Sequence, residues 1–221
     1  MPEELPDALA EEYADALADE EFAVERHSTE TVFHGRVWDV RRDEFVYGES
    51  TITREYVAHT GAVAILAMDD DDRVMLIRQY RHPVGLREWE LPAGLLDVTG
   101  EGPLVAAQRE LAEEADLEAS DWSLLSEFAT SPGGSNEVIR VYLARGLSVT
   151  PAFDRTEEEA DLETRWASLD EVVDAVLDRR IGNSILTIAA LAAHASKARG
   201  WSNLGDPNAA WPRHPLLGAE A

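Results

Sequence analysis

Residues 94–117 constrain this chain most, because they contain a predicted helix, preceded by a loop, with one apolar and one acidic side. Glu110, Glu113 and Glu114 stand at i, i+3 and i+4, so a helix places them on one face, about one turn apart. Pro103 suits the first helical position, and the apolar side is formed by Leu104, Val105, Ala107, Leu111 and Ala115. Rigidly held carboxylates suit Mg²⁺ or Mn²⁺, whereas the alternative is a solvated acidic face. Spacing alone does not decide between the two.

The wider spacing resembles the Nudix box of the Nudix hydrolases. Gly94 is followed after six residues by Glu101, and after seven more by the run Arg-Glu-Leu-Ala-Glu-Glu at 109–114. The family pattern has one residue fewer before Glu101 and a second Gly where this chain has Asp116. We expect Asp116 to end the helix in a left-handed conformation, which Asp adopts more readily than most residues other than Gly.

Three further segments, at 78–97, 131–137 and 156–166, resemble bacterial ADP-ribose pyrophosphatases in the same order. The resemblance implies an α/β fold, the Nudix α/β/α sandwich around a mixed sheet. It also implies metal-dependent hydrolysis of ADP-ribose to AMP and ribose 5-phosphate. Another nucleotide sugar or dinucleoside diphosphate is an alternative substrate. A noncatalytic module that senses ADP-ribose is a further alternative, but it would not need the intact Arg-Glu-x-x-Glu-Glu set.

The resemblance assigns the metal site to the helix and to the strand before it. Two or three Mg²⁺ or Mn²⁺ ions would bind Glu110, Glu113, Glu114 and the backbone carbonyl of Ala93. They would offset the charge of the diphosphate and activate a water molecule for attack on phosphorus. Arg109 is expected to orient these carboxylates by pairing with them, which places it with Glu113 in the catalytic set.

The general base is expected in the acidic loop at 156–166, where the family places a glutamate. The run of glutamates at 157–159 leaves both Glu158 and Glu159 open as the base. Arg78 and Arg81 precede the box and are candidates for binding the anionic substrate, with surface salt bridges as the alternative. Arg81 is preferred, because the corresponding arginine of the subfamily contacts substrate.

Alternating apolar and polar residues at 29–57 predict three antiparallel strands after an acidic arm at residues 1–25. A sheet this small needs a partner surface. In ADP-ribose pyrophosphatases this sheet exchanges across a dimer and helps to form the adenine pocket, so the resemblance implies a homodimer. Trp38 is then a candidate for stacking on the base, although packing within the sheet is the alternative. Glu137 is a candidate for binding the terminal ribose.

The remaining chain predicts a mixture of strands and helices. Two apolar segments flank the acidic residues 69–72 and predict a hairpin, and helices are expected at 169–179 and 184–199. The last residues are rich in Gly, Pro and Asn and are expected to drape over the surface or fray. We therefore divide the chain into an arm with its sheet (1–57), a Nudix domain (58–200) and a tail (201–221).

Composition excludes several classes of function. A net charge of −25 opposes nonspecific binding of nucleic acid, and the lack of cysteine excludes disulfides and thiolate chemistry. The N-terminus lacks the basic start and apolar run of a signal peptide, and no apolar segment approaches membrane-spanning length. A cytoplasmic enzyme that acts on a small molecule is expected.

Overall fold

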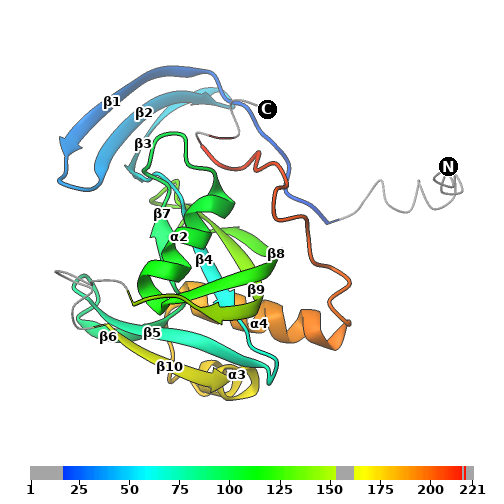
Figure 1. The fold of residues 1–221 in the computed structure, drawn as a ribbon. Coiled ribbons are helices and arrows are strands. Elements are labelled where there is room, and N and C mark those ends of the chain that lie inside the picture. The colour runs from blue at the N-terminus through cyan, green and yellow to red at the C-terminus, as the bar shows by residue number, and fades with distance from the viewer. Residues whose placement is uncertain (1–16, 153–161, 216, 218–221) are drawn as a thin grey trace, which may run out of the picture.

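The computed structural model describes residues 17–152, 162–215 and 217. A domain of two sheets and three helices makes up most of this part, and a third sheet lies at its N-terminal end (Figure 1). Most of the arm predicted for residues 1–25 falls outside the described residues. None of the helices described here has the length and apolarity needed to cross a membrane.

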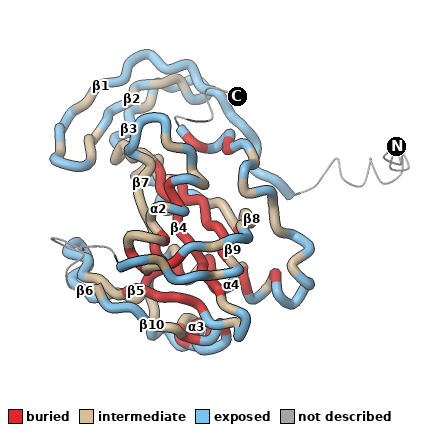
Figure 2. The backbone as a smooth tube through the Cα atoms, viewed as in Figure 1, coloured by how far each residue is buried: buried red, intermediate tan, exposed pale blue. Residues whose placement is uncertain are grey.

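The N-terminal sheet consists of β1 (Arg26–His34), β2 (Asp39–Tyr47) and β3 (Ser50–Ala58), paired antiparallel in that order. Gly48 lies in the turn that joins β2 to β3 and has a φ of +62°, which glycine adopts without strain. The three predicted strands are therefore confirmed. None of the residues in these strands, all of which are described, is buried (Figure 2).

A four-stranded mixed sheet forms the centre of the domain. Its order is β7 (Ala93–Leu95), β4 (Ala62–Ala67), β9 (Val138–Val149) and β8 (Leu117–Ala129). Strands β4 and β9 are parallel, whereas the other neighbours are antiparallel. Every residue of β4 is buried. Its alternate side chains enter two separate core clusters, so β4 is covered on both faces.

Helices cover the two faces of this sheet. Helix α2 (Pro103–Ala115) packs on β4, β7 and β8, while α3 (Leu169–Leu177) and α4 (Ser184–Ala198) pack together and cover the opposite face. Local signals set the helix starts: Ser168 accepts a hydrogen bond from the backbone of Glu171, and Asn183 accepts one from that of Leu186. The expected α/β/α sandwich is confirmed.

The hairpin predicted around residues 69–72 is wrong in one respect. The turn is present, with a bridge between Met68 and Val74, but the two strands then part into different sheets. Strand β5 (Arg73–Arg81) pairs with β6 (Leu86–Glu90) and β10 (Glu163–Ser168) in a three-stranded antiparallel sheet. Both faces of β4 and β5 carry apolar side chains, so the local pattern could not reveal which neighbours each strand would take.

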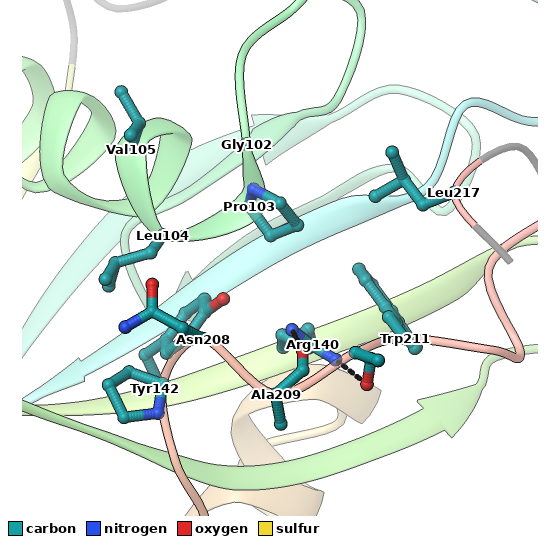
Figure 3. A pocket seen from close by; sticks show the side chains of 12 residues that line it. Gly102, Pro103, Leu104, Val105, Arg140, Tyr142, Asn208, Ala209, Trp211 and Leu217 are labelled. Atoms are coloured by element: carbon teal, nitrogen blue, oxygen red, sulfur yellow. Dashed lines mark hydrogen bonds between the residues drawn. The ribbon is translucent and has the colours of Figure 1, made fainter. Parts of the chain in front are cut away.

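The described part of the C-terminal segment packs against the central sheet and does not fray. Gly205 and Leu124 exchange two backbone hydrogen bonds of 2.9 and 3.0 Å. The buried Arg140 donates to the carbonyls of Ala209 and Ala210 at 2.9 and 3.1 Å, and its guanidinium lies 4.6 Å from the centre of the Trp211 ring (Figure 3). A cavity of about 330 Å³ lies between this segment and the start of α2. The domain boundaries assigned at residues 57 and 200 stay predictions.

Candidate active site

Arg109 gathers the acidic residues at and before α2. Its Nε and Nη2 atoms donate to the two carboxylate oxygens of Glu101 at 3.0 and 2.9 Å. Its Nη1 atom donates to Glu110 at 2.7 Å and to Glu113 at 3.0 Å. Hydrogen bonding to Arg109 lowers the pKa of Glu101, and the same contact raises the pKa of Arg109, so both groups stay charged at neutral pH. The pairing expected of Arg109 is therefore present.

Strand β7 brings backbone against the same helix. The Ala93 amide donates to Oε2 of Glu114 at 2.8 Å, and only 6% of Glu114 is exposed. The Glu110 carboxylate lies directly over Gly94, where any Cβ would collide with it. The structure thus places Ala93, Glu110 and Glu114 together, and Gly94 is the residue that allows the close approach.

The chemistry of this cluster fits a hard divalent cation, because its side-chain donors are carboxylate oxygens held on one rigid helix. In the described part of the chain, however, no three His, Cys, Asp or Glu side chains are arranged to hold a metal ion. The contacts with Arg109 give a reason, since Glu110 and Glu113 both turn toward its guanidinium. Residue type and position suit a metal, whereas the side-chain directions are set by the internal ion pairs.

Arg81 makes a bidentate ion pair with Glu90, a residue that was not predicted from the sequence. Its Nε and Nη2 atoms donate to the two oxygens of Glu90 at 2.9 and 2.7 Å, and Glu90 is buried. This fork fixes the plane of the Arg81 guanidinium. The signal in the sequence was the position of Glu90 between the apolar Trp89 and Leu91, because a carboxylate that is buried with such neighbours needs a partner.

Arg78 and Arg87 pair with the same carboxylate, that of Glu163 at the start of β10. The Arg78 guanidinium also lies 4.9 Å from the centre of the Trp89 ring. These contacts match the salt-bridge alternative, and they place both arginines beside the end of the loop that carries Glu158 and Glu159. Those two glutamates lie outside the described residues.

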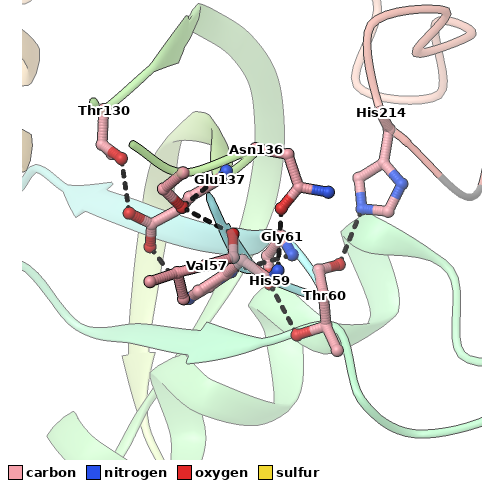
Figure 4. A network of polar contacts seen from close by, with 9 residues as sticks. Val57, His59, Thr60, Gly61, Thr130, Asn136, Glu137 and His214 are labelled. Carbon is pink, nitrogen blue, oxygen red and sulfur yellow. Dashed lines mark hydrogen bonds and ion pairs between the residues drawn. The ribbon is translucent and has the colours of Figure 1, made fainter. Parts of the chain in front are cut away.

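His59 and Glu137 belong to a polar network between the N-terminal sheet and the domain (Figure 4), and Trp38 contacts the same histidine. The rings of Trp38 and His59 stack with centres 4.0 Å apart and planes 22° apart. Nε2 of His59 lies 3.1 Å from Oε1 of Glu137. His59 was not predicted from the sequence, because one scattered histidine carries no pattern.

Comparison with known families supplies the decisive observation: the family model of the NUDIX domain matches residues 58–186, more than half of the chain. This chain belongs to the Nudix family. The matched range begins at the last residue of β3 and ends within α4, so it includes both helix layers and the central sheet.

Two relatives place the chain more closely within the Nudix family. The ADP-ribose pyrophosphatase of Mycobacterium tuberculosis is 46% identical over 180 residues, which cover 81% of this chain and 86% of that protein. The methanol dehydrogenase activator of Bacillus methanolicus is 37% identical over 162 residues, which cover 73% and 87% of the two chains.

A crystal structure of an ADP compounds hydrolase has the same fold. It superposes with a TM-score of 0.68 at 22% sequence identity and covers 83% of this chain and 99% of that one. In this Nudix chain, Asp116 follows α2 with φ 54° and ψ 38°, and its amide bonds to the carbonyl of Ala112. The left-handed conformation expected of Asp116 is therefore confirmed, so the missing glycine does not disturb the end of the helix.

Proposed function

We propose that this Nudix hydrolase splits the diphosphate of ADP-ribose into AMP and ribose 5-phosphate. The observation that carries the proposal is the 46% identity to the M. tuberculosis ADP-ribose pyrophosphatase over most of both chains. The Glu101, Arg109, Glu110 and Glu113 cluster beside Gly94 supports it, because carboxylates gathered on one helix suit a divalent cation, which would offset the charge of the diphosphate.

Nudix ADP-ribose pyrophosphatases in general need a divalent metal, and we propose Mg²⁺ or Mn²⁺ for this chain. Glu110, Glu113, Glu114 and the carbonyl of Ala93 would hold it. When bound, such a cation offsets the charge of the diphosphate and lowers the pKa of water. Arg109 contacts Glu110 and Glu113 and would hold both carboxylates near the site, and they would turn from its guanidinium toward the cation.

The remaining roles fall on residues around this centre. Glu158 or Glu159 would accept the proton of the attacking water. Arg81, held in plane by Glu90, would face the diphosphate, and Arg78 would support it. Glu137 would bind the terminal ribose and Trp38 would stack on the adenine.

We also propose that two copies of the chain associate through the N-terminal sheet. Its strands contain no buried residue, and it exposes Val32, Phe33, Val37 and Tyr47. A three-stranded sheet with exposed apolar side chains and no buried residue is marginal alone and needs a partner surface. Sedimentation equilibrium that returned the monomer mass at micromolar concentration would contradict the dimer. The cytoplasmic location stays a prediction.

The proposed reaction is tested by measuring AMP release from ADP-ribose with Mg²⁺ and with Mn²⁺. Glu114→Gln keeps the shape of the side chain and removes its charge, so the rate should fall about 100-fold or more, because even indirect supports of a metal site are worth about 10- to 100-fold. Glu118→Gln, on the exposed start of β8, is the matched control and should keep the wild-type rate.

Two outcomes would count against the proposal. Equal rates for wild type and Glu114→Gln would remove the metal assignment. Absence of AMP release from the wild type with either metal would remove the activity itself. A panel of nucleotide sugars and dinucleoside diphosphates in the same assay decides whether ADP-ribose is the preferred substrate.

A further inference from the structure

His59 lies where three separate parts of the chain meet. It follows β3 and stacks on Trp38, the residue before β2. It also faces Glu137, the residue before β9 (Figure 4). The side chain of His59 is only 8% exposed, whereas that of Glu137 is 25% exposed. The imidazole is therefore less accessible than the carboxylate that it faces.

Backbone contacts fix the orientation of the His59 ring. The Gly61 amide donates to Nδ1 at 3.0 Å, so Nδ1 must carry a lone pair. The neutral ring then has its proton on Nε2, the atom that faces the Glu137 carboxylate. Burial lowers the pKa of His59, while Glu137 acts in the opposite direction. The His59 amide is held as well, since it donates to Oδ1 of Asn136 at 2.8 Å.

Two hydroxyl groups fix Glu137 in addition to His59. Its Oε2 accepts a hydrogen bond from the Thr130 hydroxyl, and its backbone amide donates to the Ser135 hydroxyl at 3.1 Å. His59 and Thr130 thus each take one oxygen of this carboxylate, which fixes its plane. Trp38 is half-buried, and within the described residues His59 is the one aromatic ring stacked on it.

The same network reaches the Nudix box. Gly61, which donates to the His59 ring, accepts a hydrogen bond from the Leu96 amide at 3.1 Å through its carbonyl. Leu96 directly follows β7, the strand that carries Ala93 and Gly94. The ring of His59 is therefore linked through one residue to the backbone that approaches α2.

We propose that His59 is a positioning residue for substrate, which holds the Trp38 indole and the Glu137 carboxylate as one rigid unit. The inference rests on the proposed function, in which these two groups contact the base and the terminal ribose. A histidine that only filled space would need neither the fixed Nε2–H tautomer nor simultaneous contact with both groups. Preorganisation of this kind affects binding more than the chemical step.

Two variants separate the two contacts of His59. His59→Phe keeps an aromatic ring for Trp38 and removes the nitrogen that faces Glu137, while His59→Gln keeps a polar donor and removes the ring. Each should raise KM for ADP-ribose by about 5- to 10-fold, the size of one lost aromatic or polar contact, with kcat within about twofold of wild type. His194→Gln, at an exposed position of α4, is the matched control and should change neither constant.

Double variants distinguish positioning from general loss of structure. His59→Gln should add no further rise in KM when Trp38 is already Ala, and His59→Phe should add none when Glu137 is already Gln. Unchanged KM in both single variants, equal losses in kcat, or additive losses in the double variants would each overturn the proposal. Absence of turnover by the wild type would count against the proposed function instead.

A measurement on the unmodified protein covers the case in which a variant does not fold. In ¹⁵N-histidine-labelled wild type, His59 should appear as the neutral Nε2–H tautomer at pH 7.5, and added AMP should shift its ring resonances. A different tautomer, or no shift at saturating AMP, would overturn the positioning role.

Discussion

Gly94 shows how one missing side chain shapes the candidate site. The Glu110 carboxylate lies where a Cβ on Gly94 would stand, so Glu110 can keep this position only with glycine there. We predict that Gly94→Ala lowers AMP release about 10- to 100-fold, because Glu110 must turn away and a small displacement of a charged group in the site is costly.

The control for Gly94→Ala is Gly182→Ala, because a Cβ at Gly182 meets no atom within 4 Å. Circular dichroism before the assay establishes that both variants fold. Wild-type rates in Gly94→Ala would show that the contact between Gly94 and Glu110 has no part in activity.

His214 makes stability depend on pH. It is buried, its Nε2 lies 2.9 Å from the carbonyl oxygen of Thr60, and burial lowers its pKa below the usual 6.5. A histidine whose pKa is lower in the folded state binds its proton more readily when unfolded, so stability falls as the pH drops below about 6.5. Burial also lowers the pKa of His59, so His59 adds to the loss of stability at low pH.

We predict a lower melting temperature at pH 5.5 than at pH 7.5, and a smaller difference between the two in His214→Gln. Thermal unfolding followed by circular dichroism measures both. His194→Gln is exposed and should keep the wild-type difference. An equal pH dependence in His214→Gln and wild type would contradict the assignment.

At the scale of single residues, the sequence predicted conformations and contacts that involve neighbours along the chain. The left-handed Asp116 and the pairing of Arg109 with Glu113, one helical turn away, follow from positions close in the chain. Glu90 and His59 were missed, because their partners become neighbours only after β5, β6 and β9 are assembled.

At the scale of elements, Arg140 joins the C-terminal segment to β9. It is 2% exposed, pairs with Glu127 on β8 and donates to the carbonyls of Ala209 and Ala210. We predict that Arg140→Leu lowers the free energy of unfolding by about 3 kcal/mol, since it leaves a largely buried carboxylate and two carbonyls without their partner. Denaturant unfolding measures the loss.

The matched control is Arg165→Leu, which removes an exposed pair with Glu171 and should cost about 0.5 kcal/mol or less. Limited proteolysis should also cut between residues 205 and 215 sooner in Arg140→Leu than in wild type. Equal stability of the two variants would mean that Arg140 does not anchor the segment.

At the scale of the whole molecule, the net charge of −25 sets the response to salt. Like charges spread over a folded surface repel, and unfolding separates them. Raising KCl from 0.1 to 1 M shortens the screening length from about 10 to about 3 Å, so we predict a higher melting temperature in the stronger salt. An equal osmolality of sucrose is the control for solvent effects, and a fall in melting temperature with KCl would contradict the prediction.

The sequence by itself determined the features that depend on periodicity and on residues close in the chain: the acidic helix α2, the three N-terminal strands, the two capped helices and the Nudix signature. Tertiary structure alone decided the separation of β4 and β5 into two sheets, the anchoring of the C-terminal segment, and the meeting of Trp38, His59 and Glu137. The physical reason is that hydrogen bonding between strands and burial of charged side chains depend on contacts between distant segments, and a one-dimensional pattern does not specify those contacts.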